Sequence, residues 1–222
     1  MKRERALLAE IYCPEPGLRA GRLHCPASLI PAPGQFVMAL SERHPAAHRT
    51  PLFPAAIHDD GFSTLMVPEV WQPGAELDLM GPFGRGVMPP GASSRWLFIS
   101  SLPAGGTLLP LGEMGLERGL ELAWWGASGR GLDPAVEIIL DLDAGLDWSD
   151  YTACETDPET IEALRAIWRS PPAKAKIEVL VLTDLLCGFG ACQACAVTGR
   201  RGYRLGCSDG PVFDAGWLGA SR

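Results

Sequence analysis

Residues 187–197 read CGFGACQACAV, and three of these eleven residues are cysteines. A fourth cysteine follows closely, in the stretch LGCSDGPVF that covers residues 205–213. The full spacing is Cys187-x4-Cys192-x2-Cys195-x11-Cys207. A C-x4-C-x2-C run with a distant fourth cysteine is the ligand pattern of plant-type [2Fe–2S] proteins. The sequence therefore predicts that these four thiolates hold a [2Fe–2S] cluster.

The residues between the cysteines suit a loop that wraps a cluster. Gly188 and Gly190 can adopt positive φ angles, and they let backbone amides approach the sulfur atoms. Two alternatives stay open. A structural zinc site is one, although zinc ribbons use two C-x2-C knuckles and only Cys192 and Cys195 form such a pair. Four buried structural cysteines are the other.

Composition and charge narrow the class of protein. The chain has 222 residues and a net charge of −7, without a block of Lys or Arg. Nucleic acids and anionic membranes bind concentrated positive charge, so we expect neither as a partner. The sequence has no apolar run near the roughly 18 residues that cross a bilayer, and its start is a poor signal peptide. We expect a cytoplasmic protein, where thiols stay reduced and clustered cysteines bind metal.

Three regions follow one another along the chain. Residues 1–92 contain short apolar stretches between Pro and Gly, which is typical of a small β-barrel or sandwich. Residues 93–172 alternate predicted strands and helices, which favours a reduced parallel α/β layer. Residues 173–222 open with an apolar strand that leads directly into the cysteines. The predicted fold class is thus multi-domain β plus α/β, with a small C-terminal [2Fe–2S] domain.

Several elements of the middle region can be predicted individually. RWLFIS, LELAWWG and VEIILDLD should be strands, and LLPLGEMGLERG should be a short helix. The stretch TDPETIEALRAIWRS should form a longer helix that Asp157 caps. Two other cysteines, Cys13 and Cys25, lie among strand-like residues and are expected to be small buried apolar side chains.

The cysteine motifs resemble a known family. CGFGACQAC and CSDGPVF are similar to the cluster-binding end of the electron-transfer subunit of heteromeric NAD-dependent dihydroorotate dehydrogenases. Upstream, PGQFVMAL at residues 33–40 and QPGAELDLMGPFGRGV at residues 72–87 resemble its flavin-binding barrel. YTACETDPETIEALRAI at residues 151–167 resembles a strand and helix of its reductase layer. The resemblance covers most of the chain.

The resemblance implies a set of cofactors and a partner. In that family the barrel binds FAD, the α/β layer receives NADH, and the cluster passes single electrons to the FMN of a catalytic flavoprotein subunit. Carried over residue by residue, the FAD site would include Arg49, Pro51, Gly81 and Pro82. The family's barrel strand reads Arg-Pro-x-Ser, whereas here Phe53 or Pro54 occupies the Ser position and offers no hydrogen-bond donor.

The nicotinamide site departs further from the family. Its glycine turn is reduced to Gly105 and Gly106, and Glu155 and Thr156 replace the Gly-Pro that follows the cysteine at the matching position of Cys154. Several aspartates precede this cysteine and would repel a phosphate. NAD(H) is therefore not expected to bind.

The resulting hypothesis is a shortened electron-transfer subunit that relays electrons between a flavin- or nicotinamide-derived donor and a dihydroorotate dehydrogenase-like flavoenzyme. The alternative is a non-catalytic module, stabilised by zinc or a cluster, that serves assembly or redox sensing. The sequence does not assign a catalytic residue under either hypothesis.

Overall fold

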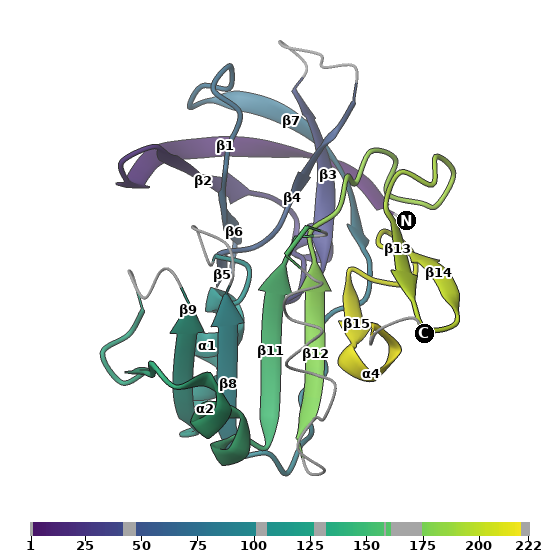
Figure 1. The fold of residues 1–222 in the computed structure, drawn as a ribbon. Coiled ribbons are helices and arrows are strands. Elements are labelled where there is room, and N and C mark those ends of the chain that lie inside the picture. The colour runs from purple at the N-terminus through teal and green to yellow at the C-terminus, as the bar shows by residue number, and fades with distance from the viewer. Residues whose placement is uncertain are drawn as a thin grey trace.

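The computed structural model describes residues 2–41, 48–100, 106–126, 132–157, 159–160 and 175–218. The chain forms a curled sheet, an α/β sheet below it, and a cysteine-bearing segment beside both (Figure 1). Within the described residues, no helix has the length and apolar character needed to cross a membrane.

The curled sheet is antiparallel and has seven strands, which confirms the predicted barrel in the form of a half-barrel. Apolar side chains alternate along its strands, as in β7, because successive residues point to opposite faces. In spatial order the strands are β4 (Thr50–Leu52), β3 (Phe36–Ser41), β7 (Ala75–Phe83), β1 (Lys2–Glu15), β2 (Leu18–His24), β6 (Gly61–Leu65) and β5 (Ala56–His58), with the 3-10 helix η1 (Ala27–Leu29) between β2 and β3.

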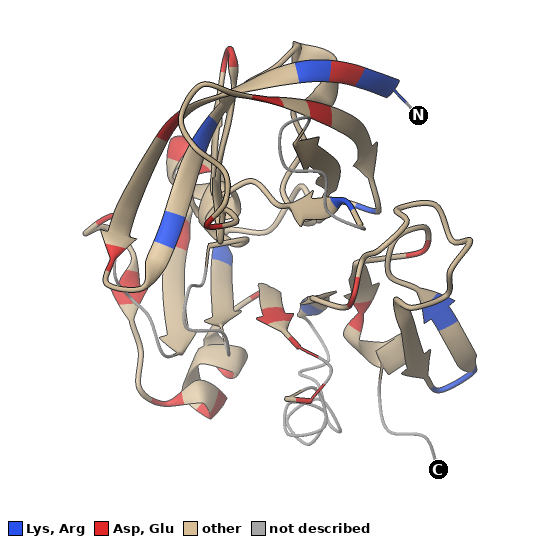
Figure 2. Ribbon diagram, turned by 90° about the horizontal axis from the view of Figure 1, so that it is seen from above, with Lys and Arg blue, Asp and Glu red and all other residues tan. Residues whose placement is uncertain are grey.

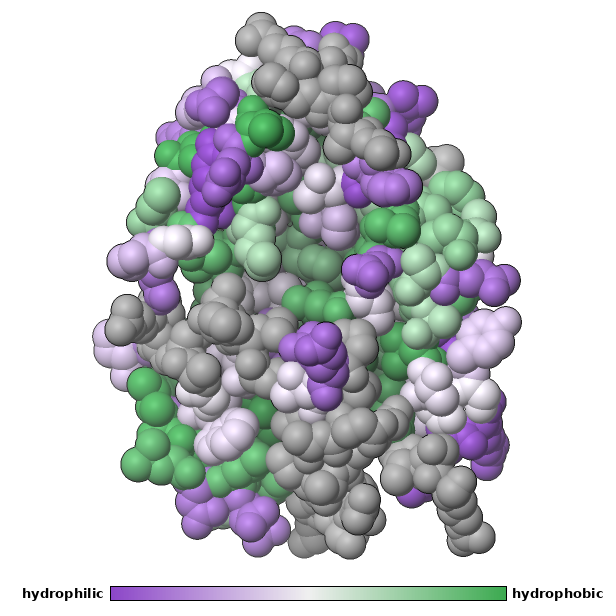
Figure 3. Space-filling view, turned by 45° about the horizontal axis from the view of Figure 1, so that its top comes forward, coloured by the Kyte–Doolittle hydropathy of each residue, from purple (hydrophilic) through white to green (hydrophobic). Residues whose placement is uncertain are grey.

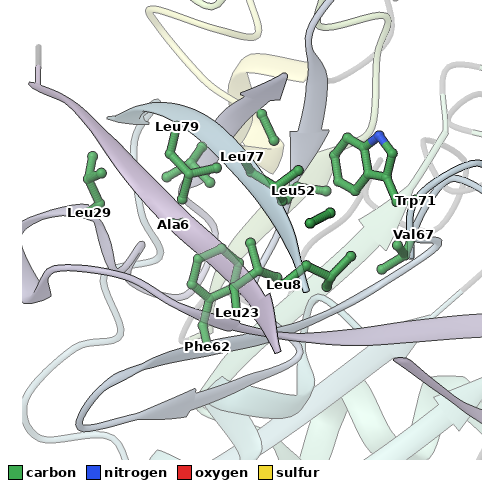
Figure 4. Close-up of a cluster of buried hydrophobic side chains, with 13 residues drawn as sticks. Ala6, Leu8, Leu23, Leu29, Leu52, Phe62, Val67, Trp71, Leu77 and Leu79 are labelled. Carbon is green, nitrogen blue, oxygen red and sulfur yellow. The ribbon is translucent and has the colours of Figure 1, made fainter. Parts of the chain in front are cut away.

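The inner face of the half-barrel encloses its own core (Figure 4). Leu8, Leu23, Phe62 and Leu77 have no exposed surface. Arg19 of β2 holds the segment after β6 against the sheet, because its guanidinium donates to the carbonyl oxygens of Pro68 at 2.5 Å and Trp71 at 2.6 Å.

The second sheet is parallel apart from its last strand, as the alternation of strands and helices predicts. Its order is β10 (Glu137–Ile138), β9 (Glu121–Gly126), β8 (Arg95–Ser100), β11 (Tyr151–Thr156), β12 (Lys176–Val181) and β15 (Val212–Asp214). Trp96 and Phe98 of β8 pack in one core with α1 (Leu109–Glu117), and Leu97 and Ile99 pack in another with α2 (Leu142–Trp148). Central strands covered on both faces are therefore apolar almost throughout.

The strand predicted over residues 136–143 is wrong for most of its length. Only Glu137–Ile138 pair with β9, and α2 begins at Leu142. Asp141 causes the change, because its side chain accepts a hydrogen bond from the amide of Ala144 at 3.1 Å and so caps the helix. The helix predicted after Asp157 lies, apart from its first residues, outside the described residues. Asp157 itself accepts hydrogen bonds from the amides of Glu159 and Thr160.

The C-terminal segment is tied into the α/β sheet. β12 pairs with β11 in parallel and with β15 antiparallel, so the sheet contains strands from both sides of the domain boundary predicted at residue 173. Between β12 and β15 lie the cysteines and a hairpin of β13 (Ala196–Gly199) and β14 (Gly202–Leu205), and the short α4 (Ala215–Leu218) follows β15. The predicted limits 1–92, 93–172 and 173–222 stay a prediction.

A buried carboxylate connects the α/β sheet to the segment between β7 and β8, which leads out of the half-barrel. Glu178 on β12 is 1% exposed, and it accepts from the Met88 amide at 2.8 Å and from the Tyr151 hydroxyl at 2.9 Å. Lys176 and Arg85 supply positive charge at 2.9 and 3.4 Å. Burial and this carboxylate raise the pKa of Tyr151, which therefore stays a hydrogen-bond donor.

Removing this carboxylate should destabilise the fold strongly. We expect Glu178→Ala to lower the free energy of unfolding by about 3–5 kcal/mol, since two cations and a buried hydroxyl lose their partner. Glu76→Ala is the control, because Glu76 is 58% exposed and pairs with Arg5 at the surface, where a pair contributes about 0–1 kcal/mol. Urea denaturation of both variants measures the difference, and equal losses would contradict the assigned role of Glu178.

Candidate metal centre

The four predicted cysteines lie on one excursion of the chain, which leaves β12 after Val181 and returns at Pro211. The amide of Val181 donates to the carbonyl of Pro211 at 2.9 Å and closes the excursion at its base. All seven cysteines of the chain are free thiols.

The thiols form two close pairs. The Sγ atoms of Cys195 and Cys207 are 3.3 Å apart, and both side chains are buried. Cys187 and Cys192 interact through their side chains, with Cys192 exposed. Within the described ranges, no three His, Cys, Asp or Glu side chains are grouped so as to hold a metal ion. The structure thus shows two pairs of sulfur donors in one excursion.

Glycine conformation sets the path between the pairs. Gly188 and Gly190 have φ angles of +81° and +83°, in the region that glycine was expected to provide. The turn at Gly190 directs its amide to the Cys207 sulfur at 3.1 Å, so the first part of the loop also contacts the second thiol pair.

Backbone amides favour a thiolate at Cys187. Burial alone would raise the pKa of this thiol, but hydrogen bonds from the amides of Cys192, Phe189 and Ala191 lower the pKa to about 6. At Cys207 the opposite holds, because burial and the neighbouring Cys195 thiol raise the pKa to about 12. The loop amides thus favour the charged form of Cys187, whereas burial favours the neutral thiol of Cys207. We call Cys187 and Cys192 the outer pair, and Cys195 and Cys207 the inner pair.

The end of the half-barrel packs directly against the cysteines. Phe36, Met38 and Phe83 share one buried cluster with Cys195 and Cys207. The sequence suggested strands in this region but did not indicate that these side chains line the cysteine site. These three side chains come from strands that are distant in sequence from the cysteines, so only the folded structure brings them to the site.

The residues predicted for FAD lie on the half-barrel, but the structure gives them partners within the protein. The Arg49 guanidinium bonds the Asp78 carboxylate at 2.5 Å and the Asp78 carbonyl at 2.7 Å. Pro51 of β4 lies opposite Met38 of β3. Gly81 and Pro82 lie on β7, where Gly81 is opposite Lys2. Arg49 is thus already paired with a carboxylate, whereas the resemblance expects it to meet the phosphate or flavin of FAD.

Glu155 occupies the carboxyl end of β11, beside the end of β8. It is fully buried and accepts hydrogen bonds from the Ser100 hydroxyl at 2.6 Å and from the Thr107 hydroxyl. Open α/β sheets bind ligands at such strand ends. Burial raises the pKa of Glu155 in spite of these donors. A buried carboxyl group therefore stands where the resemblance expects glycine and proline. Gly105 lies outside the described residues.

Cys13 and Cys25 differ in burial, and Cys25 packs partly buried against the core of the half-barrel, close to expectation. Cys13 is exposed, so the prediction of a buried apolar side chain is wrong there. It lies on β1 near the turn to β2, where that strand extends beyond the core. Cys25 is half-buried, and burial together with Asp60 raises its pKa to about 11.

Comparison with known proteins connects this geometry to a family. Residues 183–219 match the iron-sulfur cluster binding domain of dihydroorotate dehydrogenase B. In sequence, none of the curated proteins compared matches the chain. The finding confirms the predicted resemblance over the cysteine-bearing segment and supports an iron–sulfur cluster.

Solved structures extend the likeness to the whole fold. An NADH-dependent reduced ferredoxin-NADP oxidoreductase, studied for flavin-based electron bifurcation, aligns with a TM-score of 0.75 at 19% identity, over 96% of this chain and 88% of its own. The ferredoxin reductase in carbazole 1,9a-dioxygenase aligns at 0.63 and 16% identity, over 78% and 69%. Phthalate dioxygenase reductase, described as a modular structure for electron transfer from pyridine nucleotides to [2Fe-2S], aligns at 0.58 and 11% identity, over 85% and 70%. The ferredoxin-reductase-like fold is confirmed.

The contact between Gly188 and the half-barrel should be measurable by substitution. Gly17 and Gly188 share a φ of +81°, where a side chain costs about 1–2 kcal/mol. A Cβ on Gly17 meets nothing within 4 Å, whereas on Gly188 it lies 3.0 Å from Met38 and 3.1 Å from Phe83. We expect Gly17→Ala to lower the unfolding free energy by that strain alone and Gly188→Ala to lower it further. Chemical denaturation measures both free energies. Equal losses in the two variants would mean that Met38 and Phe83 move aside without cost.

Glu155 should make stability depend on pH. Its pKa in the folded chain is raised above the ordinary 4.5, so the unfolded chain loses this proton first and stability falls as the pH rises from about 4.5 through the folded pKa. Glu155→Gln removes this ionisation. We expect the variant to gain stability relative to the original chain between pH 4 and pH 8, as measured by urea denaturation. A difference that stays constant with pH would refute the assignment.

Proposed function

We propose that this chain is the electron-transfer subunit of a dihydroorotate dehydrogenase-like enzyme, and that Cys187, Cys192, Cys195 and Cys207 hold a [2Fe–2S] cluster. The observation that carries the proposal is the arrangement of the thiols in two close pairs. Two bridged irons take two thiolates each, so one pair would serve each iron. The match of residues 183–219 supports the same assignment.

The residues present fit this cofactor. The donor set is four cysteines in a C-x4-C-x2-C pattern with a distant fourth. The amide of Gly190 already donates to the Cys207 sulfur, and three amides of the loop donate to that of Cys187. Hydrogen bonds of this kind disperse negative charge on sulfur and tune the reduction potential. When bound, the cluster would carry one electron at a time.

The partner in this proposal is a catalytic flavoprotein subunit of the dihydroorotate dehydrogenase type. A flavin accepts or releases two electrons in single steps, so it can couple a one-electron carrier to a two-electron reaction. The reduced thiols on which the proposal depends suit the cytoplasm, which is the location we propose. Dihydroorotate as the physiological substrate is implied by the family resemblance alone.

FAD on the half-barrel is a second part of the proposal, with Arg49, Pro51, Gly81 and Pro82 as its residues. The fold of the reductases supports it. The ion pair between Arg49 and Asp78 opposes it. Glu155 similarly opposes a nicotinamide in the α/β layer, since a buried carboxyl group occupies the strand end where such ligands bind. We therefore propose that electrons enter from another protein's redox centre or from FAD, without direct hydride transfer from NADH.

Replacing one cysteine should remove the cluster. We expect anaerobically purified protein to contain iron and sulfide in equal amounts, about two each per chain. Cys192→Ser should lose the visible absorbance and most of the iron, because one iron loses a ligand. Cys25→Ser is the control and should keep both, since Cys25 lies on the half-barrel. Flavin released on denaturation would report the FAD site in the same sample.

Two results would reject the assignment. One is full cluster absorbance in both variants, which would mean that Cys192 is not a ligand. The other is a colourless protein with one zinc per chain, which would favour the non-catalytic module over the electron-transfer subunit.

A further inference from the structure

The hairpin of β13 and β14 carries three arginines in an acidic protein. Residues 196–205 contain Arg200, Arg201 and Arg204 and not one Asp or Glu, while the whole chain has a net charge of −7. All three arginines are exposed. Figure 2 shows the hairpin with blue segments and without red ones.

These arginines differ from others of the chain in what surrounds them. Arg3, Arg5, Arg22, Arg49 and Arg85 each form an ion pair with a carboxylate. Among the residues that the structure describes, no carboxylate pairs with the three guanidinium groups of the hairpin. Tyr203, between them in sequence, is 62% exposed. Arg and Tyr are the residue types that dominate the binding energy of protein interfaces.

The hairpin is held rigidly on the rest of the segment. Trp217 of α4 stacks on Phe213 with ring centroids 5.0 Å apart, and the Arg204 guanidinium lies 4.5 Å above the Trp217 ring. A Cβ on Gly199 would lie 2.5 Å from that ring, so the backbone of β13 packs directly on it. Because this packing fixes the hairpin backbone before binding, an association at this surface does not have to order the hairpin itself.

The base of the hairpin lies at the inner thiol pair. β13 begins one residue after Cys195 and β14 ends two residues before Cys207, and the amide of Gly206 donates to the carbonyl of Cys195 at 2.8 Å. The four residues of β13 span about 13 Å between the thiol pair and the turn of the hairpin. In Figure 3 the right-hand edge, where this segment lies, shows purple hydrophilic residues next to pale green ones. A protein bound to the hairpin would lie close to the cysteines.

We propose that the hairpin β13–β14 is the docking surface for an acidic face of the protein with which the cysteine-bound cluster exchanges electrons. This inference rests on the proposed function and names the charge of the partner's surface. Opposite charges steer two proteins together and raise the association rate, with a strong dependence on salt. Transient electron-transfer complexes bury little area, so a few charged residues suffice. A nucleic acid also carries negative charge, but the acidic remainder of the chain would repel a polymer of phosphates.

Electron transfer to acceptors of opposite charge tests the inference. The full chain, loaded with its cluster and reduced, is mixed with cytochrome b5, which is acidic, or with cytochrome c, which is basic, over a range of salt. We expect the rate constant with cytochrome b5 to fall as salt increases. Arg201→Glu should reduce it roughly tenfold at low salt, with cluster absorbance unchanged. Arg118→Glu, the same charge reversal at the exposed end of α1, should change it less than about twofold.

The outcomes separate this inference from the proposed function. Oxidation of the reduced protein by a neutral quinone reports the cluster alone, and failure there rejects the proposed function. If the quinone reacts but Arg201→Glu and Arg118→Glu affect the cytochrome b5 rate equally, the docking surface is rejected. It is also rejected if a short single-stranded DNA oligonucleotide binds the hairpin at physiological salt and Arg201→Glu abolishes that binding.

Discussion

The antiparallel pairing of β12 with β15 is the constraint on which the cysteine site depends. Leu180 lies opposite Val212, and the amide of Val181 bonds the carbonyl of Pro211, so both ends of the excursion are fixed to one sheet. Closing a long loop costs entropy, and the sheet supplies the hydrogen bonds and apolar burial that offset the cost. A second closure, from the amide of Gly206 to the carbonyl of Cys195, brings the inner thiols together.

The half-barrel adds a third contact, and it determines the environment of the sulfurs. Phe36, Met38 and Phe83 exclude water from the inner pair. Burial disfavours negative charge on sulfur, while amide hydrogen bonds favour it. Under the proposed function the balance of these two effects sets the potential of the centre. Under the same proposal, the half-barrel would influence the redox chemistry whether or not it holds a flavin of its own.

The sequence predicts well those features of the fold and the site that depend on residues close together in the chain. Cysteine spacing, the alternation in β7 and the apolar run of β8 are each visible within a few residues. Asp141 was a local signal for a helix as well, but the apolar residues around it favoured a strand. Glu178 was visible only as an acid inside an apolar strand. Its partners, including Tyr151 and Met88, come from distant segments, and no local pattern identifies them. The contact of Met38 with the cysteine loop was hidden for the same reason.

The two thiol pairs differ in exposure, and this difference has a consequence for electron flow. Cys195 and Cys207 lie against the half-barrel, whereas Cys192 is exposed and Phe189, between the two loop glycines, is 60% exposed. Under the proposed function, a centre held by both pairs would have one side insulated by protein and one side near solvent. Electrons exchanged with a flavin in the half-barrel would pass the insulated side. Those exchanged with another protein would pass the outer side. The basic hairpin begins at the inner pair, but its Leu205 also lies next to Gly190 of the loop, so the hairpin borders both pairs. Under the two proposals, one short segment would serve both as ligand and as contact surface.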